Sequence, residues 1–272
     1  MSTNFFLSTG GPSLTESGVA YPSGFTPPAV PNGMTQLLFD DFLGTSLNTS
    51  LWDPYSGAPG GTTGWWRPDH ITVGSYGSTS TPSVCNLNMY YDPSGSGTNN
   101  WVGGGMGADG TEIVVGSEAY VAMRLDPYAA GGLVGIALLI GWLSNWPPEI
   151  DFFETYAWGS GPVGNGPATL HWGAANSQVT DSFTGVDLTI WHVWGVKWGT
   201  TTISYTLDGT VWASRTNPDQ STSDSHSLVQ PQVLSLQIQT GDSSVGYPPQ
   251  DTSITAANPI KMQIDWASVF SP

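Results

Sequence analysis

Side chains that build long helices are scarce in this chain. Its 272 residues include only five Lys and Arg and five Glu, whereas Gly and Pro number 35 and 21. Helix interiors favour Ala, Leu, Lys, Arg, Gln and Glu and are weakened by Gly and Pro, so a helical fold is nearly excluded. The 13 Trp residues and an apolar content of 39% can form a large core and argue against disorder. We therefore expect an all-β chain, whose length suits one large domain as well as two small ones.

The charge of the chain excludes several classes of partner. The formal net charge is −16, and the basic residues form no cluster. Phosphate binding needs cations that displace counterions, and acidic membrane surfaces attract basic segments, so we expect no nucleic-acid and no membrane partner. The most apolar stretch, 131–143, is too short to span a bilayer. The single cysteine, Cys85, cannot form an intrachain disulfide, so stability must come from packing.

Composition changes near residue 34. Residues 1–34 are rich in Gly, Ser, Thr and Pro and lack clear periodicity, which is typical of an arm or linker. Residues 35–272 are predicted to form one domain. The apolar run 5–7 follows no basic residue, so no secretory signal peptide is predicted. We expect the protein to act outside the cell, after loss of a leader or after release by lysis. The arm would attach the chain to a larger assembly. The alternative interpretation is that the protein acts inside the cell.

Short segments of alternating apolar and polar residues recur after residue 35. In the segment 120–125 the odd-numbered residues are apolar and Arg124 lies on the polar face, from which it can reach a cleft or solvent. Asp208-Gly209 joins two strand-like segments and suits a tight hairpin. Apolar residues also alternate from Ile260 to Trp266. These patterns predict a β-sandwich of two packed antiparallel sheets, one of which has an open polar face.

The densest acidic segment is Glu149-Ile150-Asp151-Phe152-Phe153-Glu154. On a regular strand Glu149 and Asp151 share one face, and Glu154 falls on the other. A one-residue bulge at Phe152–Phe153 would return Glu154 to the face of the other two acids. The segment therefore predicts three carboxylates along one open strand face.

The three carboxylates have a catalytic interpretation and two simpler ones. Like charges this close cannot all ionise, so one carboxyl holds its proton, as a general acid must. Two carboxyls about 5–5.5 Å apart suit a retaining glycosidase. Solvated surface acids, or a cation site with oxygen ligands, are the alternatives. Flat rings flank the motif and could stack on sugars; they belong to Trp142, Trp146, Tyr156 and Trp158.

From about residue 36 to 271 the chain resembles glycoside hydrolase family 16, the laminarinase-like β-glucanases and their galactanase relatives. The acidic motif is similar to the bulged active-site strand of that family. Further similar segments are Phe39-Asp40-Asp41-Phe42, Tyr120 to Arg124, Leu170-His171-Trp172, Trp191-His192 through Trp198 with Asp208-Gly209, and Ile264 to Phe270. Two departures are Pro148, where many members have Gly, and Leu138-Leu139, where many laminarinases have a cleft tryptophan. Because of these two departures, the resemblance does not identify the substrate.

The resemblance implies a jelly roll with a concave substrate cleft. Glu149 would be the nucleophile, Asp151 its assistant and Glu154 the acid/base of a double displacement, without a required cofactor. His171 would contact Asp151 or substrate, although a lone His is often a core or rim residue. Asp265 would join backbone carbonyls in a structural calcium site on the convex side, although a solvated strand Asp is the commoner outcome. The remaining candidate substrate-binding residues are Arg124, Trp65, Trp66, Trp142, Trp146 and Trp158.

Our leading hypothesis is an endo-acting retaining glycoside hydrolase that cleaves a β-linked polysaccharide, either β-1,3-glucan-like or galactan-like. The alternative is a non-catalytic glycan-binding jelly roll, such as a virion tail or adhesion component that grips a cell-surface polysaccharide. A β-sandwich with a purely structural role is the third hypothesis. An enzyme would turn over the glycan, and a binding module would bind it saturably without turnover. A structural sandwich would not bind it.

Overall fold

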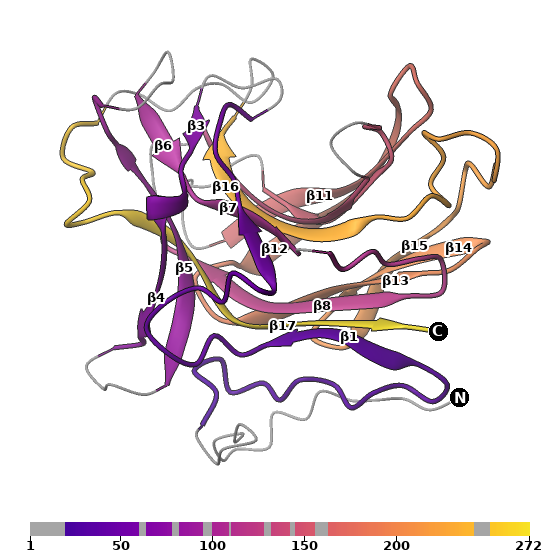
Figure 1. Ribbon diagram of the computed structural model, residues 1–272, viewed down its shortest axis with the longest axis horizontal. Helices are drawn as coiled ribbons and strands as arrows, with labels where there is room; N and C mark the ends of the chain where they lie inside the picture. The colour runs from indigo at the N-terminus through magenta and orange to yellow at the C-terminus, as the bar shows by residue number, and fades with distance from the viewer. Residues whose placement is uncertain are drawn as a thin grey trace.

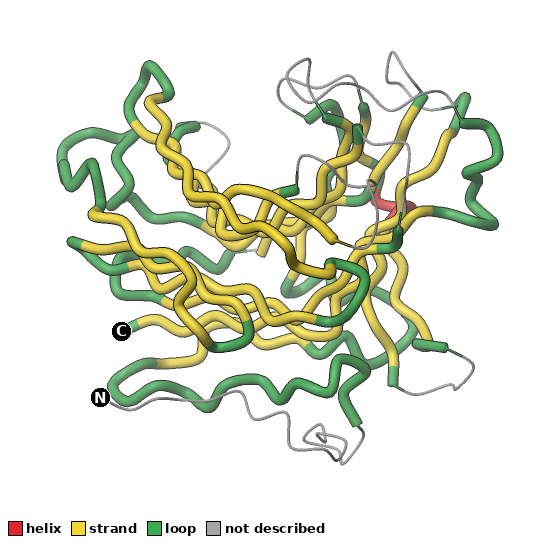
Figure 2. Tube along the Cα trace, turned by 180° about the vertical axis from the view of Figure 1, so that it is seen from behind, coloured by secondary structure: helices red, strands yellow, loops and turns green. Residues whose placement is uncertain are grey.

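The computed structural model describes residues 20–59, 64–77, 82–94, 100–108, 110–127, 132–141, 145–155, 163–241 and 251–272. Within these ranges the strands form two sheets stacked face to face (Figure 1, Figure 2). One short 3-10 turn, η1 (Pro68–His70), is the helical element of this part of the chain. No helix in the same ranges is long and apolar enough to cross a membrane. The prediction of an all-β sandwich is confirmed.

Ten strands form the back sheet. They are β1 (Thr35–Asp40), β3 (Trp65–Trp66), β4 (Ile71–Ser75), β5 (Ser83–Tyr91), β6 (Trp101–Gly103), β8 (Glu118–Leu125), β13 (His192–Trp198), β14 (Thr202–Leu207), β15 (Thr210–Thr216) and β17 (Ile260–Ser271). The main path runs β15-β14-β13-β8-β17-β5-β6-β3, while β1 pairs with β17 and β4 with β5. Pairing is antiparallel except between β3 and β6.

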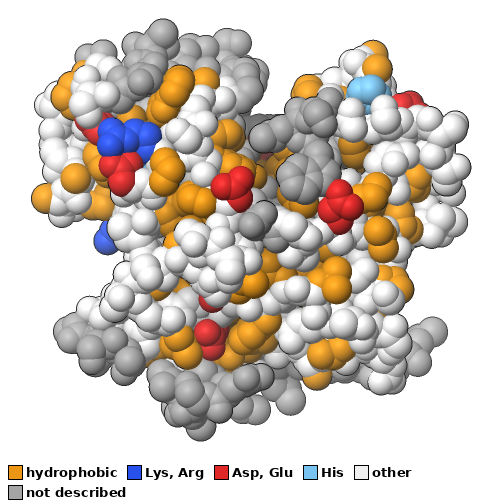
Figure 3. Space-filling model, in the orientation of Figure 1, with side chains coloured by type: hydrophobic (Ala, Val, Ile, Leu, Met, Phe, Trp, Pro, Cys, Tyr) orange, Lys and Arg blue, Asp and Glu red, His pale blue; other side chains and the backbone are white. Residues whose placement is uncertain are grey.

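Seven antiparallel strands form the front sheet, in the order β12-β11-β10-β9-β16-β7-β2. They are β2 (Trp52–Pro54), β7 (Gly105–Ala108), β9 (Leu133–Ile140), β10 (Glu149–Glu154), β11 (Val163–Trp172), β12 (Ser177–Asp187) and β16 (Val233–Thr240). In Figure 1 this sheet lies above the back sheet, and strand ends and loops rise on both sides of its upper face. Figure 3 shows a hollow between two lobes in the same place.

The core lies between the two sheets and determines which way each side chain points. Val121 and Met123 of β8 and Ile150 and Phe152 of β10 belong to one buried cluster. Because side chains alternate along a strand, the polar residues of β8 point out from the back sheet. The acids of β10 point out from the front sheet, on the opposite side of the sandwich.

Residues 20–34, the described part of the expected arm, lie against the outer face of the back sheet. The Tyr21 ring is buried with Tyr120, Trp266 and Phe270, and the Trp266 indole N–H donates to the carbonyl of Phe25 at 2.9 Å. This segment therefore covers an apolar patch that the sheet would otherwise expose.

The expected alternation from Ile260 to Trp266 is interrupted. Ile264 is paired with Met123, but Trp266, two residues later, is paired with Ala122, so a bulge lies between Ile264 and Trp266. Ile264 packs in the core, whereas Trp266 packs on the outer face. The prediction that Trp266 shares the face of Ile264 is wrong, because the extra residue shifts the side-chain parity of the strand.

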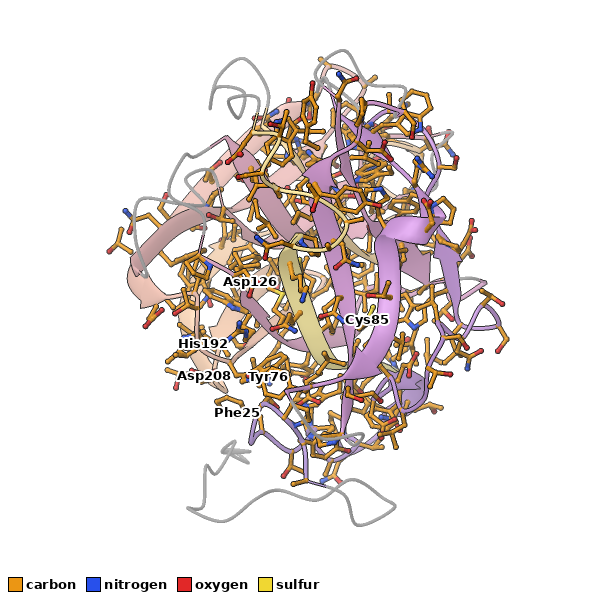
Figure 4. The ribbon with its side chains drawn as sticks, turned by 90° about the vertical axis from the view of Figure 1, so that its left-hand side faces the viewer. Phe25, Tyr76, Cys85, Asp126, His192 and Asp208 are labelled. Carbon is orange, nitrogen blue, oxygen red and sulfur yellow. The ribbon has the colours of Figure 1, made fainter. Side chains whose placement is uncertain are left out.

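The Asp208-Gly209 hairpin is confirmed. Both residues have positive φ, at 49° and 78°, and they join β14 to β15. Asp208 also contacts β13: its Oδ2 lies 2.8 Å from His192 Nδ1, and its Oδ1 accepts the Val193 N–H at 2.7 Å. His192 and Asp208 lie side by side in Figure 4. This pair therefore links the hairpin to the middle of the back sheet.

Candidate active site

Strand β10 carries the predicted bulge. Asp151 is paired with Leu138 of β9, and Phe153 is paired with the next residue, Ala137, so Phe152 is the extra residue. Phe152 and Phe153 are both buried, and the Phe153 ring lies 4.7 Å from that of Trp194. Two consecutive side chains thus anchor the bulge in the core. Glu154 returns to the face of Glu149 and Asp151, as the sequence predicts.

His171 of β11 lies beside the acids on the same face. It is paired in register with Glu149. Its Nε2 lies 3.3 Å from Asp151 Oδ2 and 3.9 Å from Glu149 Oε1. Its Nδ1 lies 2.9 Å from Oδ1 of Asn176, in the turn that follows β11. With Nδ1 facing the Asn176 amide oxygen, Nε2 is the ring nitrogen that faces the two carboxyl groups.

Trp146 covers the first acid. Its indole N–H donates to Glu149 Oε2 at 2.9 Å, and its ring centroid lies 5.9 Å from that of His171. The Trp146 side chain is nevertheless 45% exposed. A large ring that holds a carboxylate and still faces solvent offers a stacking surface for a sugar ring next to Glu149.

Burial and mutual repulsion raise the pKa values of two acids well above the ordinary range. For Glu149 the main cause is burial, followed by the charge of Asp151; the His171 charge and the Trp146 N–H act in the opposite direction. For Asp151, which is 2% exposed, the causes are burial and the charge of Glu154. Glu149 and Asp151 also share a hydrogen bond. The pair therefore binds a proton more tightly than two separate solvated carboxyl groups would.

The floor of the hollow beside the acids is apolar. On β9, Val134, Ile136 and Leu138 form a small buried cluster with Ile140 on the face away from the main core. Ile140, Leu138 and Ile136 are the register partners of Glu149, Asp151 and Glu154. This apolar stripe accounts for much of the desolvation of the acids.

Tyr55 and Trp66 lie farther across the front sheet. Their ring centroids are 5.1 Å apart, and the Tyr55 hydroxyl donates to Ser235 Oγ at 2.8 Å. Burial raises the pKa of Tyr55 to about 12, with a contribution from the charge of Glu149. Gly105 and Gly107 of β7 make room for the Tyr55 ring, because a Cβ at either position would collide with it. Together Tyr55 and Trp66 form a second aromatic surface.

Sequence reasoning missed two residues of this site, Tyr55 and Asn176. Tyr55 reaches Ser235 across 180 positions of sequence, so no local pattern could reveal the contact. Asn176 has φ 53°, a left-handed conformation that Asn tolerates better than most residues. An Asn in a short turn directly after the His171 strand was the available signal.

The other predicted substrate-binding residues have different positions. The Trp66 indole N–H donates to the carbonyl of Ile238 in the front sheet at 3.1 Å, whereas Trp65, its neighbour on β3, points to the opposite side by strand alternation. Trp142 and Trp158 lie outside the described residues. Arg124 does not join the site: it is on the outer face of the back sheet, where it donates to the Thr189 carbonyl at 3.0 Å and pairs with Asp126 at 2.9 Å. The expectation that it lines the cleft is corrected, because β8 belongs to the other sheet.

Asp265, the candidate calcium ligand, lies on the outer face of the back sheet. Its Oδ2 accepts the Ser23 N–H at 2.8 Å, while its buried Oδ1 has no hydrogen-bond partner. Burial raises the pKa of Asp265 to about 7, and the charge of Asp41 contributes. A spare carboxylate oxygen close to a second acid fits a calcium ion, whose further ligands would be carbonyl or water oxygens. Among the described residues, the group of three that could hold a metal is instead Glu149, Asp151 and His171.

Comparisons with known proteins identify the fold. No protein-family model and no curated protein matches the sequence. Among solved structures, the endo-1,3-β-glucanase from Streptomyces sioyaensis has a TM-score of 0.67 at 20% identity, covering 91% of this chain and 100% of the other. SCLam, a non-specific endo-β-1,3(4)-glucanase from family GH16, scores 0.68 at 18% identity, covering 90% and 94%. β-Agarase A in complex with oligoagarose scores 0.67 at 13% identity, covering 89% and 94%. The chain therefore has the jelly-roll fold of family 16 glycoside hydrolases.

Proposed function

We propose that this protein is an endo-acting retaining glycoside hydrolase that cleaves a β-linked polysaccharide. The observation that carries the proposal is the bulge in β10, which aligns Glu149, Asp151 and Glu154 on the exposed face of the front sheet. The same fold in the endo-β-1,3-glucanases named above supports it. Solvated surface acids would not be buried beside an apolar stripe and held by a tryptophan and a histidine.

In the first step ionised Glu149 attacks the anomeric carbon of the sugar. The glycosidic bond breaks, its electron pair goes to the leaving oxygen, and protonated Glu154 supplies a proton to that oxygen. Asp151, the more buried partner, holds the proton shared with Glu149, and the Trp146 N–H stabilises the Glu149 charge. The Glu149 carboxylate is thereby available as a nucleophile despite its raised pKa.

In the second step water hydrolyses the glycosyl-enzyme. Glu154, now ionised, removes a proton from the water, whose oxygen attacks the anomeric carbon and releases Glu149. Two inversions at one carbon give net retention of configuration. Glu154 ends protonated and Glu149 ionised, so the cycle closes without an external proton donor.

We infer that the substrate is a neutral or weakly charged glycan of the β-1,3-glucan or galactan type. Three exposed or partly exposed rings, those of Trp146, Tyr55 and Trp66, offer stacking surfaces on the front sheet. Cationic side chains that would select a strongly acidic polymer are rare on the face drawn in Figure 3. We also propose an extracellular site of action, and Trp142 and Trp158 as further sugar-binding residues.

The experiment is a polysaccharide panel with reducing-end and product-size analysis. Wild type should release oligosaccharides of several sizes from at least one β-linked glucan or galactan, and Glu149→Gln should lose the activity while keeping its melting temperature. Equal activity in both proteins would overturn the assignment. Saturable binding without product over long incubation would instead favour the non-catalytic glycan-binding alternative.

A further inference from the structure

Glu149, Asp151 and His171 present three metal-ligand atoms to one point, and we propose that they bind a zinc ion in competition with catalysis. One ligand atom from each residue lies within 4.8 Å of the other two. Tetrahedral zinc with bonds of roughly 2.0–2.1 Å has ligand-to-ligand distances of about 3.3–3.4 Å. His171 Nε2 lies 3.3 Å from the Asp151 oxygen and 3.9 Å from the Glu149 oxygen. The distance between His171 and Asp151 therefore already matches that of a tetrahedral site, and the Glu149 oxygen lies farther away.

A neighbouring residue already orients the histidine as a metal ligand. Asn176 Oδ1 lies 2.9 Å from His171 Nδ1 and can accept its N–H, while Nε2 is the ring nitrogen that faces the two acids and would coordinate the metal. Zinc-binding histidines usually donate their second N–H to a carboxylate or carbonyl oxygen in this way. The turn that holds Asn176 is closed by a hydrogen bond from its N–H to the Gly173 carbonyl at 2.8 Å.

The acids are positioned rigidly. Glu149 and His171 are register partners on adjacent strands, and Asp151 is 2% exposed. The buried Oδ1 of Asp151 has no hydrogen-bond partner, so this carboxylate is not fully satisfied by the protein. A divalent cation would replace the proton that Glu149 and Asp151 share and would offset the repulsion between the two ionised carboxylates, which a neutral ligand cannot do.

The ligand set selects the kind of cation. An imidazole with two carboxylates suits zinc, and also cobalt or copper, whereas calcium and magnesium prefer oxygen ligands alone. The Glu149 side chain is 15% exposed, so water can supply the fourth ligand. Zinc at this point would occupy the carboxylate proposed as nucleophile. The inhibitory consequence rests on the proposed function, but metal binding itself does not.

The test is calorimetric titration of the full chain with zinc chloride, without substrate, together with the visible spectrum of the cobalt-loaded protein. Asn176→Gly suits the left-handed backbone and removes only the side-chain acceptor. His226→Gln is the matched control, since His226 also lies beside an acid, Asp224, at 3.4 Å but outside the site. Melting temperatures confirm that each variant is folded.

We expect one zinc ion per chain in wild type and His226→Gln, loss of that binding in His171→Ala, and affinity lower by about tenfold or more in Asn176→Gly. Cobalt-loaded wild type should show the strong visible bands of a four-coordinate ion. Zinc affinity that is unchanged in both His171→Ala and Asn176→Gly, or no binding in wild type, would overturn the inference. A chain that hydrolyses glycans but binds no zinc refutes this inference alone; one that binds zinc but releases no product refutes the proposed function alone.

Discussion

Replacing Asp265 with asparagine should change how stability depends on pH. Asp265 is buried, and its pKa in the folded chain is raised to about 7 from 3.8. The folded chain therefore holds this proton more tightly than the unfolded chain does. The stabilisation is complete below about pH 4 and is lost as the pH rises to about 7.

The magnitude follows from the size of the shift. A rise of the pKa from 3.8 to about 7 corresponds to about 4 kcal/mol at about 1.4 kcal/mol per unit. An asparagine side chain would keep an acceptor for the Ser23 N–H but would never ionise. At pH 8 Asp265→Asn should therefore unfold with a free energy up to about 4 kcal/mol higher than wild type, whereas at pH 4 the gain should vanish.

The assay is urea unfolding of both proteins at several pH values, with and without calcium chloride. Calcium should stabilise wild type at pH 8, because it neutralises the ionised carboxylate, and should not affect Asp265→Asn. The stability difference between the two proteins should therefore shrink when calcium is added. A difference that stays constant from pH 4 to pH 8 without calcium would refute the reasoning.

Three further substitutions test the site and the fold. Trp146→Phe keeps an aromatic ring but removes the N–H that holds Glu149, so kcat should fall about 10-fold or more with little change in KM; an unchanged kcat would contradict the role given to the indole. Phe153→Ala removes one anchor of the bulge and should cost about 3–5 kcal/mol in urea unfolding, and a loss below about 1 kcal/mol would speak against that anchor. Arg124 lies on the outer face of the back sheet, so Arg124→Ala should leave KM and kcat unchanged. A large rise in KM would show that Arg124 contributes to substrate binding after all.

Local sequence patterns predict the features that depend on strand periodicity. The spacing of Glu149, Asp151 and Glu154, together with two consecutive Phe residues, is enough to indicate the bulge. The Asp208-Gly209 turn requires only the conformational preferences of its two residues. Periodicity assigns residues to faces, so it separates Arg124 from the core correctly.

What periodicity cannot assign is the sheet to which a strand belongs. The polar face of its strand made Arg124 a candidate for the cleft, but that face looks away from the front sheet. No pattern of acidic residues marks the bulge before Trp266 in the sequence. This bulge moves the side chains that follow it to the opposite face of the sheet. The contact of Tyr55 with Ser235 forms only when β7 and β16 pair, which is a property of the whole fold.

The anomeric configuration of the first product tests the central account most directly. Proton NMR during hydrolysis of the oligosaccharide identified by the panel should show the β-anomer first, followed by slow mutarotation, because Glu149 and Glu154 act in two successive inversions. Initial appearance of the α-anomer would show a single displacement and would contradict the role of Glu149 as nucleophile.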